Sequence, residues 1–235
     1  IMKHTTPLSL ITGMACLLLP LPTLQAEGDF KIRTLVPDGA EFWWARAHAD
    51  VNADGLLDFF VVNNNARGGW LAWYETLPDG PSVRHLIAET GPEGGTFAAG
   101  DLEAGDIDGD GDIDVLGPVS PGEWVGAVEP TELFWYEQTN SGWKPHFIGS
   151  FPDFVKDFDL ADLNGDGKLD VAGTCFETYR MIVYRQDNPR KWTKVADIPV
   201  DSLHEGQDVG DVDGDGDVDV VSTAFWFENP GGPMT

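Results

Sequence analysis

A nine-residue string that occurs four times constrains the fold of this chain more than any other feature. Its copies begin at Asp50, Asp106, Asp162 and Asp211, at spacings of 56, 56 and 49 residues. Each copy has the form Asp-x-Asn/Asp-x-Asp-Gly-x-x-Asp. A period of about 50 residues indicates a repeat architecture. Oxygen-bearing side chains at alternate positions, with a glycine at the sharp turn, are typical of a loop that binds a hard cation. The sequence therefore predicts a repeat domain with one cation-binding loop in each unit.

The four loops differ from an EF-hand, although both use oxygen ligands. An EF-hand carries a bidentate Glu at position 12, whereas position 12 here is Val61, Gly117, Gly173 or Ser222. We therefore expect side-chain ligands at positions 1, 3, 5 and 9 and a backbone carbonyl ligand at position 7. The predicted ligands of four Ca²⁺ ions are Asp50, Asn52, Asp54, Leu56, Asp58, Asp106, Asp108, Asp110, Asp112, Asp114, Asp162, Asn164, Asp166, Lys168, Asp170, Asp211, Asp213, Asp215, Asp217 and Asp219. Asn52 replaces an Asp, so the first site is expected to be weaker.

Short apolar runs around each loop predict an all-β fold. A buried strand such as Phe59–Val62 follows the loop, then an aromatic strand such as Leu133–Glu137, then a fourth strand such as Val83–Ile87. Small residues precede the loop, as in Phe97–Gly100. Four strands per unit, with small residues on the first and bulky ones on the third, are typical of a β-propeller blade. We expect antiparallel blades at residues 41–89, 97–150, 153–199 and 204–235, the last together with residues 30–36.

With these motifs, the chain resembles the FG-GAP/VCBS-type calcium-binding β-propeller family. The loop segments AAGDLEAGDIDGDGDIDVLG, DLADLNGDGKLDVAG and VGDVDGDGDVDVVS carry the resemblance, together with the strands WYE and FWFENPGG. It covers roughly residues 29–235. The resemblance implies blades of four antiparallel strands around a channel. It is specific for Ca²⁺ but implies no particular activity.

The two ends of the chain lead to separate expectations. A basic start followed by the apolar run Leu8–Leu19 predicts a cleaved signal peptide at residues 1–26, and hence a secreted or periplasmic domain at 27–235. The last unit stops after its third strand, and residues 30–36 resemble a fourth strand. Either residues 30–36 close a four-bladed ring, or the blades are part of a larger propeller, for example a seven-bladed one, or of an open array. An open ring would favour self-association through its exposed edge.

Charge and loop composition limit the function. A net charge of −26 argues against a nucleic-acid partner, and no membrane insertion is expected after signal cleavage. Three, five, three and five of the 40 acidic residues lie in the four loops, where divalent cations would relieve their repulsion. Aromatic and polar residues between the other strands, such as Trp124, favour a binding or adhesion module for a glycan or a cell-surface protein.

Two alternatives remain open at the level of sequence. One is a polysaccharide lyase or sugar dehydratase, for which the sequence assigns no catalytic residue. Its candidate acid and base groups are Glu41, Arg46, His48, His204 and Glu205. The other is a structural module that binds calcium and no further ligand.

Overall fold

The computed structural model describes residues 33–36, 43–63, 69–97, 100–120, 129–201 and 205–234. The predicted signal peptide lies outside these residues. The chain divides into two units, residues 1–33 and 34–235. Every element described below belongs to the second unit.

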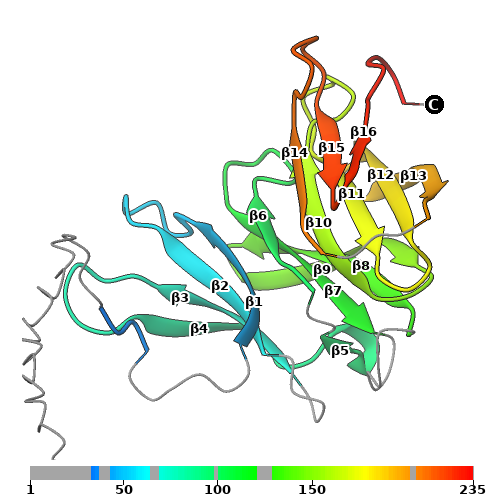
Figure 1. Ribbon diagram of the computed structural model, residues 1–235. Helices are drawn as coiled ribbons and strands as arrows, with labels where there is room; N and C mark the ends of the chain where they lie inside the picture. The colour runs from blue at the N-terminus through cyan, green and yellow to red at the C-terminus, as the bar shows by residue number, and fades with distance from the viewer. Residues whose placement is uncertain are drawn as a thin grey trace, which may run out of the picture. The chain divides into compact units, whose positions relative to one another are not determined.

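The described residues form antiparallel β-strands and one short 3₁₀ turn, so the predicted all-β class is confirmed (Figure 1). The strands fall into four sheets, one in each predicted repeat unit. The first sheet holds β1 (Trp43–Ala49), β2 (Asp58–Asn63), β3 (Trp70–Glu75) and β4 (Val83–Ala88). The second holds β5 (Thr96–Phe97), β6 (Glu103–Gly105), β7 (Asp114–Ser120), β8 (Thr131–Thr139) and β9 (Gly142–Phe151), after the turn η1 (Pro92–Gly94). The third holds β10 (Val155–Ala161), β11 (Asp170–Cys175), β12 (Arg180–Asn188) and β13 (Lys191–Pro199), and the last holds β14 (Gln207–Gly210), β15 (Asp219–Ser222) and β16 (Phe225–Phe227).

The first strand of the second sheet is interrupted, which the sequence did not predict. Both β5 and β6 pair with β7, and Gly100 and Leu102 lie between them. A Cβ atom on Gly100 would lie 2.4 Å from the carbonyl oxygens of Val155 and Lys156 in β10. The backbones of neighbouring first strands therefore approach too closely for a side chain at this point.

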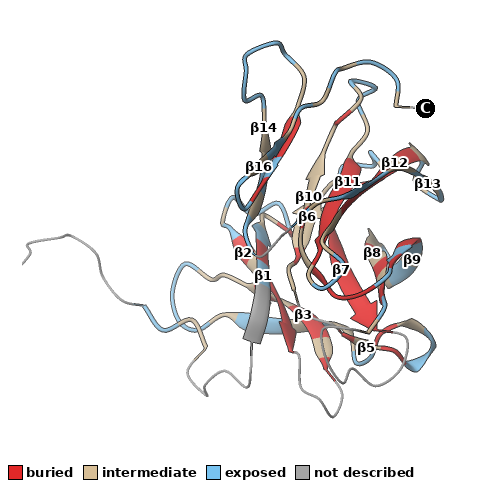
Figure 2. Cartoon of the chain, turned by 45° about the vertical axis from the view of Figure 1, so that its right-hand side comes forward, coloured by how far each residue is buried: buried red, intermediate tan, exposed pale blue. Residues whose placement is uncertain are grey.

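The hydrophobic core consists mainly of layers between successive sheets. Phe60 of the first sheet packs in one cluster with Tyr136 of the second. Trp135 of the second sheet packs with Phe158 of the third, and Val183 of the third packs with Val220 of the last. Figure 2 shows that buried residues are frequent on β2, β7 and β11. Full burial of one such side chain contributes about 1.5–3 kcal/mol, so the layers hold the four sheets together.

The first strands of successive sheets also lie next to one another. β1 contacts β6, β6 contacts β10, and β10 contacts β14. The sheets are therefore joined in chain order along their first strands as well as through the core layers.

The segment before the first sheet lies where the sequence did not predict it. Its described end is not at the last sheet: the carbonyl of Leu35 accepts a hydrogen bond from the backbone N–H of Ser82 at 2.9 Å. Val36 packs against the cluster of Val61, Ala72 and Tyr74 in the first sheet. Assigning residues 30–36 to the last blade was therefore wrong for the described residues, because Val36 covers apolar side chains of the first sheet. Residues 30–32 lie outside the described part.

Candidate metal centres

Each of the four predicted loops connects the first strand of a sheet to the second. The chain turns at positions 4 and 6, where the backbone adopts left-handed φ values. In the second loop Gly109 has a φ of 79° and Gly111 a φ of 96°. Glycine adopts these values without steric cost. The first loop instead has Ala53 at position 4, with a φ of 58°, so it carries backbone strain that the other three loops avoid.

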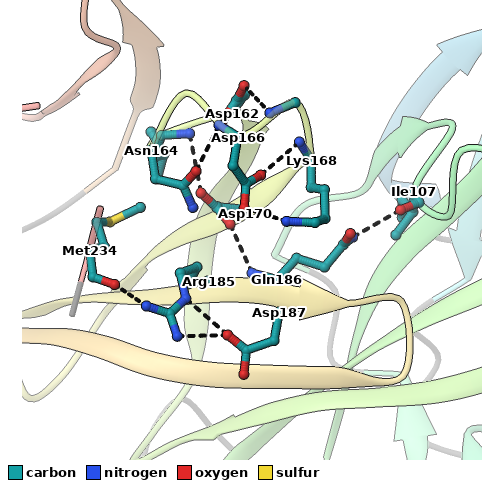
Figure 3. A network of polar contacts seen from close by, with 12 residues as sticks. Ile107, Asp162, Asn164, Asp166, Lys168, Asp170, Arg185, Gln186, Asp187 and Met234 are labelled. Atoms are coloured by element: carbon teal, nitrogen blue, oxygen red, sulfur yellow. Dashed lines mark hydrogen bonds and ion pairs between the residues drawn. The ribbon is translucent and has the colours of Figure 1, made fainter. Parts of the chain in front are cut away.

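In the first, third and fourth loops, the side chains at positions 1, 3 and 5 accept hydrogen bonds from the backbone of their own loop. The third loop is drawn in Figure 3: Asp162 accepts from the N–H groups of Asp166 and Gly167 at 3.0 and 2.8 Å. Asn164 accepts from Asp166 at 2.9 Å, and Asp166 accepts from the N–H of Lys168 at 3.0 Å. The Lys168 ammonium also forms an ion pair with Asp166. The loop therefore folds its oxygens inward around a small volume.

The Asp at position 9 connects each loop to the third strand of its own sheet. Asp58, Asp114, Asp170 and Asp219 are at most 1% exposed. One oxygen of Asp114 accepts from the N–H of Ile107 at 3.1 Å, and the other accepts from the N–H of Gln138 at 2.8 Å. The other three loops repeat both bonds. Position 9 therefore has a structural role in addition to its predicted role as a ligand.

Burial and hydrogen bonding act on these four carboxyl groups in opposite directions. Burial raises the pKa of Asp114 to about 7 and that of Asp170 to about 6, against the opposing effect of the N–H donors. Burial also raises the pKa of Asp58. In contrast, the N–H of Asn229 is the main cause that lowers the pKa of Asp219. The last sheet has no described sheet on its outer side, so burial has less effect on the charged form there.

Amide side chains join each of the first three loops to the next sheet, and the sequence analysis missed them. The Nε2 of Gln138 donates to the carbonyl of Val51 at 3.3 Å, and the Nε2 of Gln186 donates to the carbonyl of Ile107 at 2.9 Å. The Nδ2 of Asn229 donates to the carbonyl of Leu163 at 2.7 Å. Figure 3 shows Gln186 between its own sheet and Ile107. The available signal was a Gln near the end of the third strand, or an Asn just after it, in three of the four units.

The residue at position 2 of each of the first three loops supplies the carbonyl for this bond. Its side chain enters the layer between the sheets: Val51, Ile107 and Leu163 are 5%, 2% and 5% exposed. In the fourth loop the matching residue, Val212, is 49% exposed. The first three loops are therefore held from two sides, by their own third strand and by the following sheet.

The donor sets of the second and fourth loops fit a calcium ion. One carboxylate oxygen each from Asp106, Asp108 and Asp114 lies within 4.8 Å of the others, and Asp211, Asp213 and Asp215 show the same convergence. Among the described residues, the Oδ1 atom of Asp108 is buried and has no hydrogen-bond partner. A buried carboxylate oxygen without a partner is costly, and a cation in the loop would satisfy it. All-oxygen donors are what Ca²⁺ prefers.

The predicted ligands of the first and third loops lie in similar loops, with amides at position 3. Asn52 donates from its amide nitrogen to Asp54 at 3.2 Å and to Glu75 at 3.4 Å. At position 7, the N–H groups of Leu56, Asp112, Lys168 and Asp217 donate to the carboxylate at position 5. Whether their carbonyls bind a cation, as predicted, stays a prediction.

The candidate acid and base groups are not brought together within the described residues. Arg46 and His48 are exposed on β1, and Glu205 forms a 3.4 Å ion pair with Lys156. Glu41 and His204 lie outside the described residues, as does Trp124 of the predicted ligand face. The lyase and dehydratase alternatives therefore gain no support from this geometry.

Comparisons with known proteins show the family of the chain and solved structures to which it is similar. A family model described as an FG-GAP-like repeat matches residues 50–117 and 162–222, more than half of the chain. A search of curated proteins finds no match. The chain is similar to the V. cholerae biofilm matrix protein Bap1 at 17% identity and a TM-score of 0.44. That similarity covers 86% of this chain and 32% of Bap1, so the chain spans about a third of that protein's length.

Proposed function

The chain belongs to the FG-GAP-like repeat family, and on this premise we propose that it is a calcium-binding β-propeller module that binds a partner outside the cell. The family match includes all four predicted loops. The proposal has three parts, namely the cation, the propeller and the extracellular partner.

The unpartnered Oδ1 of Asp108, together with the converging carboxylates around it, carries the calcium part of the proposal. Positions 1, 3, 5 and 9 would hold the ion, with the position-7 carbonyl as the fifth donor. A bound Ca²⁺ supplies two positive charges to loops that hold three to five carboxylates each. Burial is the main cause that raises the pKa of Asp108 and of Asp114, and repulsion from neighbouring carboxylates adds to it. A bound Ca²⁺ would offset that repulsion.

The order in which the sheets pack supports the propeller part. Each sheet places its first strand beside the first strand of the next sheet, and the faces between them are closed by apolar layers. A propeller repeats this relationship around an axis. The small residues at these strands, such as Gly100, fit the crowding expected near that axis.

A glycan or a cell-surface protein is the class of partner that we propose. The predicted signal peptide would export the domain, and the charge of −26 disfavours nucleic acid. No helix among the described residues has the length and apolar character to cross a bilayer. The sequence between the other strands holds aromatic and polar residues, such as Trp124, that favour a partner of this class.

Calcium binding is tested first. Isothermal titration of the EGTA-treated protein is expected to show four sites, with the first loop the weakest. If only folded protein binds, each site adds about 2.7 kcal/mol to the free energy of unfolding when free calcium is at 100 times the dissociation constant of that site. EGTA is therefore expected to lower the melting temperature and calcium to restore it. The absence of calcium uptake by folded protein would refute this part.

Partner binding is tested separately, with calcium-loaded protein on a glycan array and on intact cells. We expect a signal that EGTA removes and calcium restores. The variant Asp215→Asn, at position 5 of the fourth loop, is expected to weaken the signal at low calcium and to leave it unchanged in excess calcium. Loaded, folded protein that binds neither glycans nor cells would favour a purely structural module.

A further inference from the structure

A polar pocket lies between the second and third sheets. It has a volume of about 500 Å³, which is within the usual range of small-molecule sites. Its lining comes from the end of β9, the turn before β12, and the strands β12 and β13. Because β11 runs from the third metal loop to the turn before β12, the pocket and that loop lie at opposite ends of the sheet.

Hydrogen bonds hold the backbone on both sides of the pocket. The hydroxyl of Tyr184 donates to the carbonyl of Ser150 at 2.7 Å and accepts from the N–H of the same residue at 3.0 Å. Asp153, which is 2% exposed, accepts from the N–H groups of Glu177 and Thr178 at 3.1 and 2.9 Å. The walls of the pocket are therefore fixed before a ligand arrives, which lowers the entropic cost of binding.

Three charged side chains line the pocket, and two of them keep donors for a ligand. Asp197 accepts hydrogen bonds from the Nε of Arg180 at 2.5 Å and from the Nζ of Lys194 at 2.9 Å. No described residue accepts a hydrogen bond from the two terminal nitrogens of Arg180. Two cationic side chains thus face one anionic side chain, in a chain whose net charge is −26. The guanidinium is able to bind a carboxylate through two parallel hydrogen bonds.

The repeat fold does not require these charges. In the strand register of the second sheet, Glu132 stands at the place of Arg180. Phe147 stands at the place of Asp197 and is 50% exposed, so that place tolerates an uncharged residue. Partly exposed ion pairs also add little to the stability of a fold. The charged set is therefore particular to the third sheet, and stability does not explain it.

The mixture of donors and acceptor fits an acidic sugar. Arg180 and Lys194 donate to a carboxylate, whereas Asp197 keeps lone pairs for sugar hydroxyls, since a carboxylate accepts about four hydrogen bonds. The hydroxyl of Ser150 has no partner among the described residues and is able to donate or accept. The ring of Pro152 is exposed and offers an apolar surface to the C–H groups of a sugar. A simple anion brings no hydroxyl for Asp197 and is repelled by it.

We propose that this pocket binds a carboxylate-bearing sugar residue of a glycan. The carboxylate of the sugar lies on Arg180 and Lys194, and its hydroxyls bond to Asp197 and Ser150. The inference rests on the proposed function, because it names the class of glycan that the module binds. The metal loops stabilise the fold and do not contact the sugar, since they lie at the other end of the strands.

The probes are fluorescein-labelled trigalacturonate, triglucuronate and sialyllactose, each with its neutral methyl ester. Fluorescence anisotropy with the calcium-loaded full chain is expected to show saturable 1:1 binding of at least one acid. Its ester is expected to bind at least about tenfold more weakly, because charge-assisted hydrogen bonds are lost. The comparison among the three acids tells a hexuronate from a sialic acid.

Two variants change the pocket in independent ways. Arg180→Gln removes the charge that holds the carboxylate and is expected to weaken binding of the acid at least about tenfold. Ser150→Trp fills the pocket without changing its charge and is expected to weaken binding of acid and ester alike. Melting temperatures in calcium establish that each variant is folded.

The matched control is Arg84→Gln in the first sheet, at the place that corresponds to Lys194. The guanidinium of Arg84 lies over the ring of Trp70, 4.0 Å from its centroid, and does not line the pocket. This variant is expected to bind the acidic trisaccharide as the unmodified chain does.

The proposal is overturned if no acidic trisaccharide binds, if acid and ester bind equally, or if the two pocket variants leave binding unchanged. Equal binding of a hexaglutamate peptide would assign the pocket to an acidic protein, and displacement by equimolar inorganic phosphate would assign it to a simple anion. Either result rejects the sugar. A signal on the glycan array or on cells that Arg180→Gln leaves intact would reject this inference alone and leave the proposed function standing.

Discussion

The second and last sheets place similar residues at the same positions, yet one set is buried and the other is not. In the second sheet Ile107, Leu116 and Trp135 are at most 2% exposed, under the third sheet. In the last sheet Val212, Val221 and Trp226 are 49%, 38% and 46% exposed. Trp135 pairs with Leu116 as Trp226 pairs with Val221. The difference in exposure therefore comes from the following sheet, which the second sheet has and the described part of the last sheet has not. The repeat motif specifies an apolar face, and the next sheet buries it.

The largest expected effect comes from truncating the two matching tryptophans, Trp135 and Trp226. Trp135→Ala is expected to lower the free energy of unfolding by about 3–5 kcal/mol, because it opens a cavity in a closed layer. Trp226→Ala is expected to lower it by less than about 1 kcal/mol, since surface changes have small effects. Urea denaturation in calcium measures both. Equal losses for the two variants would mean that the outer face of the last sheet is covered in solution.

The second test concerns acidic groups on the first strands. Burial is the main cause that raises the pKa of Glu103 to about 8, with Asp101, Asp159 and Asp208 adding to it. A carboxyl group whose pKa is higher folded than unfolded stabilises the fold below its unfolded pKa, and this stabilisation is lost as pH rises through the folded pKa. Between pH 4.5 and about 8, the unmodified chain is therefore expected to lose stability.

The variant Glu103→Gln is expected to reduce this loss, to which the raised pKa values of Asp114 and Asp170 also contribute, and to be more stable at pH 8 by on the order of 2 kcal/mol. Asp208→Asn, at the matching but exposed place in β14, is expected to change stability much less. Melting temperatures from pH 5 to pH 8.5, in roughly half-unit steps, give the comparison. A flat profile for the unmodified chain would contradict the burial of Glu103.

The third test concerns the hydrogen bonds that amide side chains donate between sheets. Gln186→Ala removes the donor to the buried carbonyl of Ile107 and is expected to cost about 1–3 kcal/mol. The first sheet has Thr76 at the corresponding position, where its N–H donates to Asp58 at 2.7 Å and no side-chain bond to a preceding loop is described. Thr76→Ala should therefore be nearly neutral in the same thermal assay. Similar losses for both variants would show that the bond between sheets contributes little.

The smallest expected effect comes from the strained first loop. Ala53→Gly relieves a positive φ in a non-glycine residue and is expected to stabilise the chain by up to about 1 kcal/mol. The reverse change in the second loop, Gly109→Ala, is expected to destabilise it by a similar amount. Differential scanning calorimetry in excess calcium measures both variants. A loss of stability in Ala53→Gly would show that the strain is not relieved by glycine.

The sequence predicted the features that the nine-residue motif determines, namely the loops and the start of the strand that follows each loop. The Asp at position 9 begins the second strand of every sheet, as in β2 and β7, because the loop must end where the buried apolar run starts. It did not predict Gln138, Gln186 or Asn229 as donors, because their acceptors belong to another repeat and become neighbours only after the sheets pack. The position of Val36 was missed for a similar reason: its apolar pattern suits more than one sheet.

The hydrogen bonds that Gln and Asn side chains donate between sheets have a consequence for how the chain unfolds. Each one ties the backbone of one loop to the third strand of the following sheet, so melting a loop withdraws an acceptor from its C-terminal neighbour. Nearest-neighbour coupling of this kind makes the array cooperative even though each sheet touches few others. Unfolding of one repeat is therefore expected to destabilise its neighbours, and first the repeat that follows it in the chain.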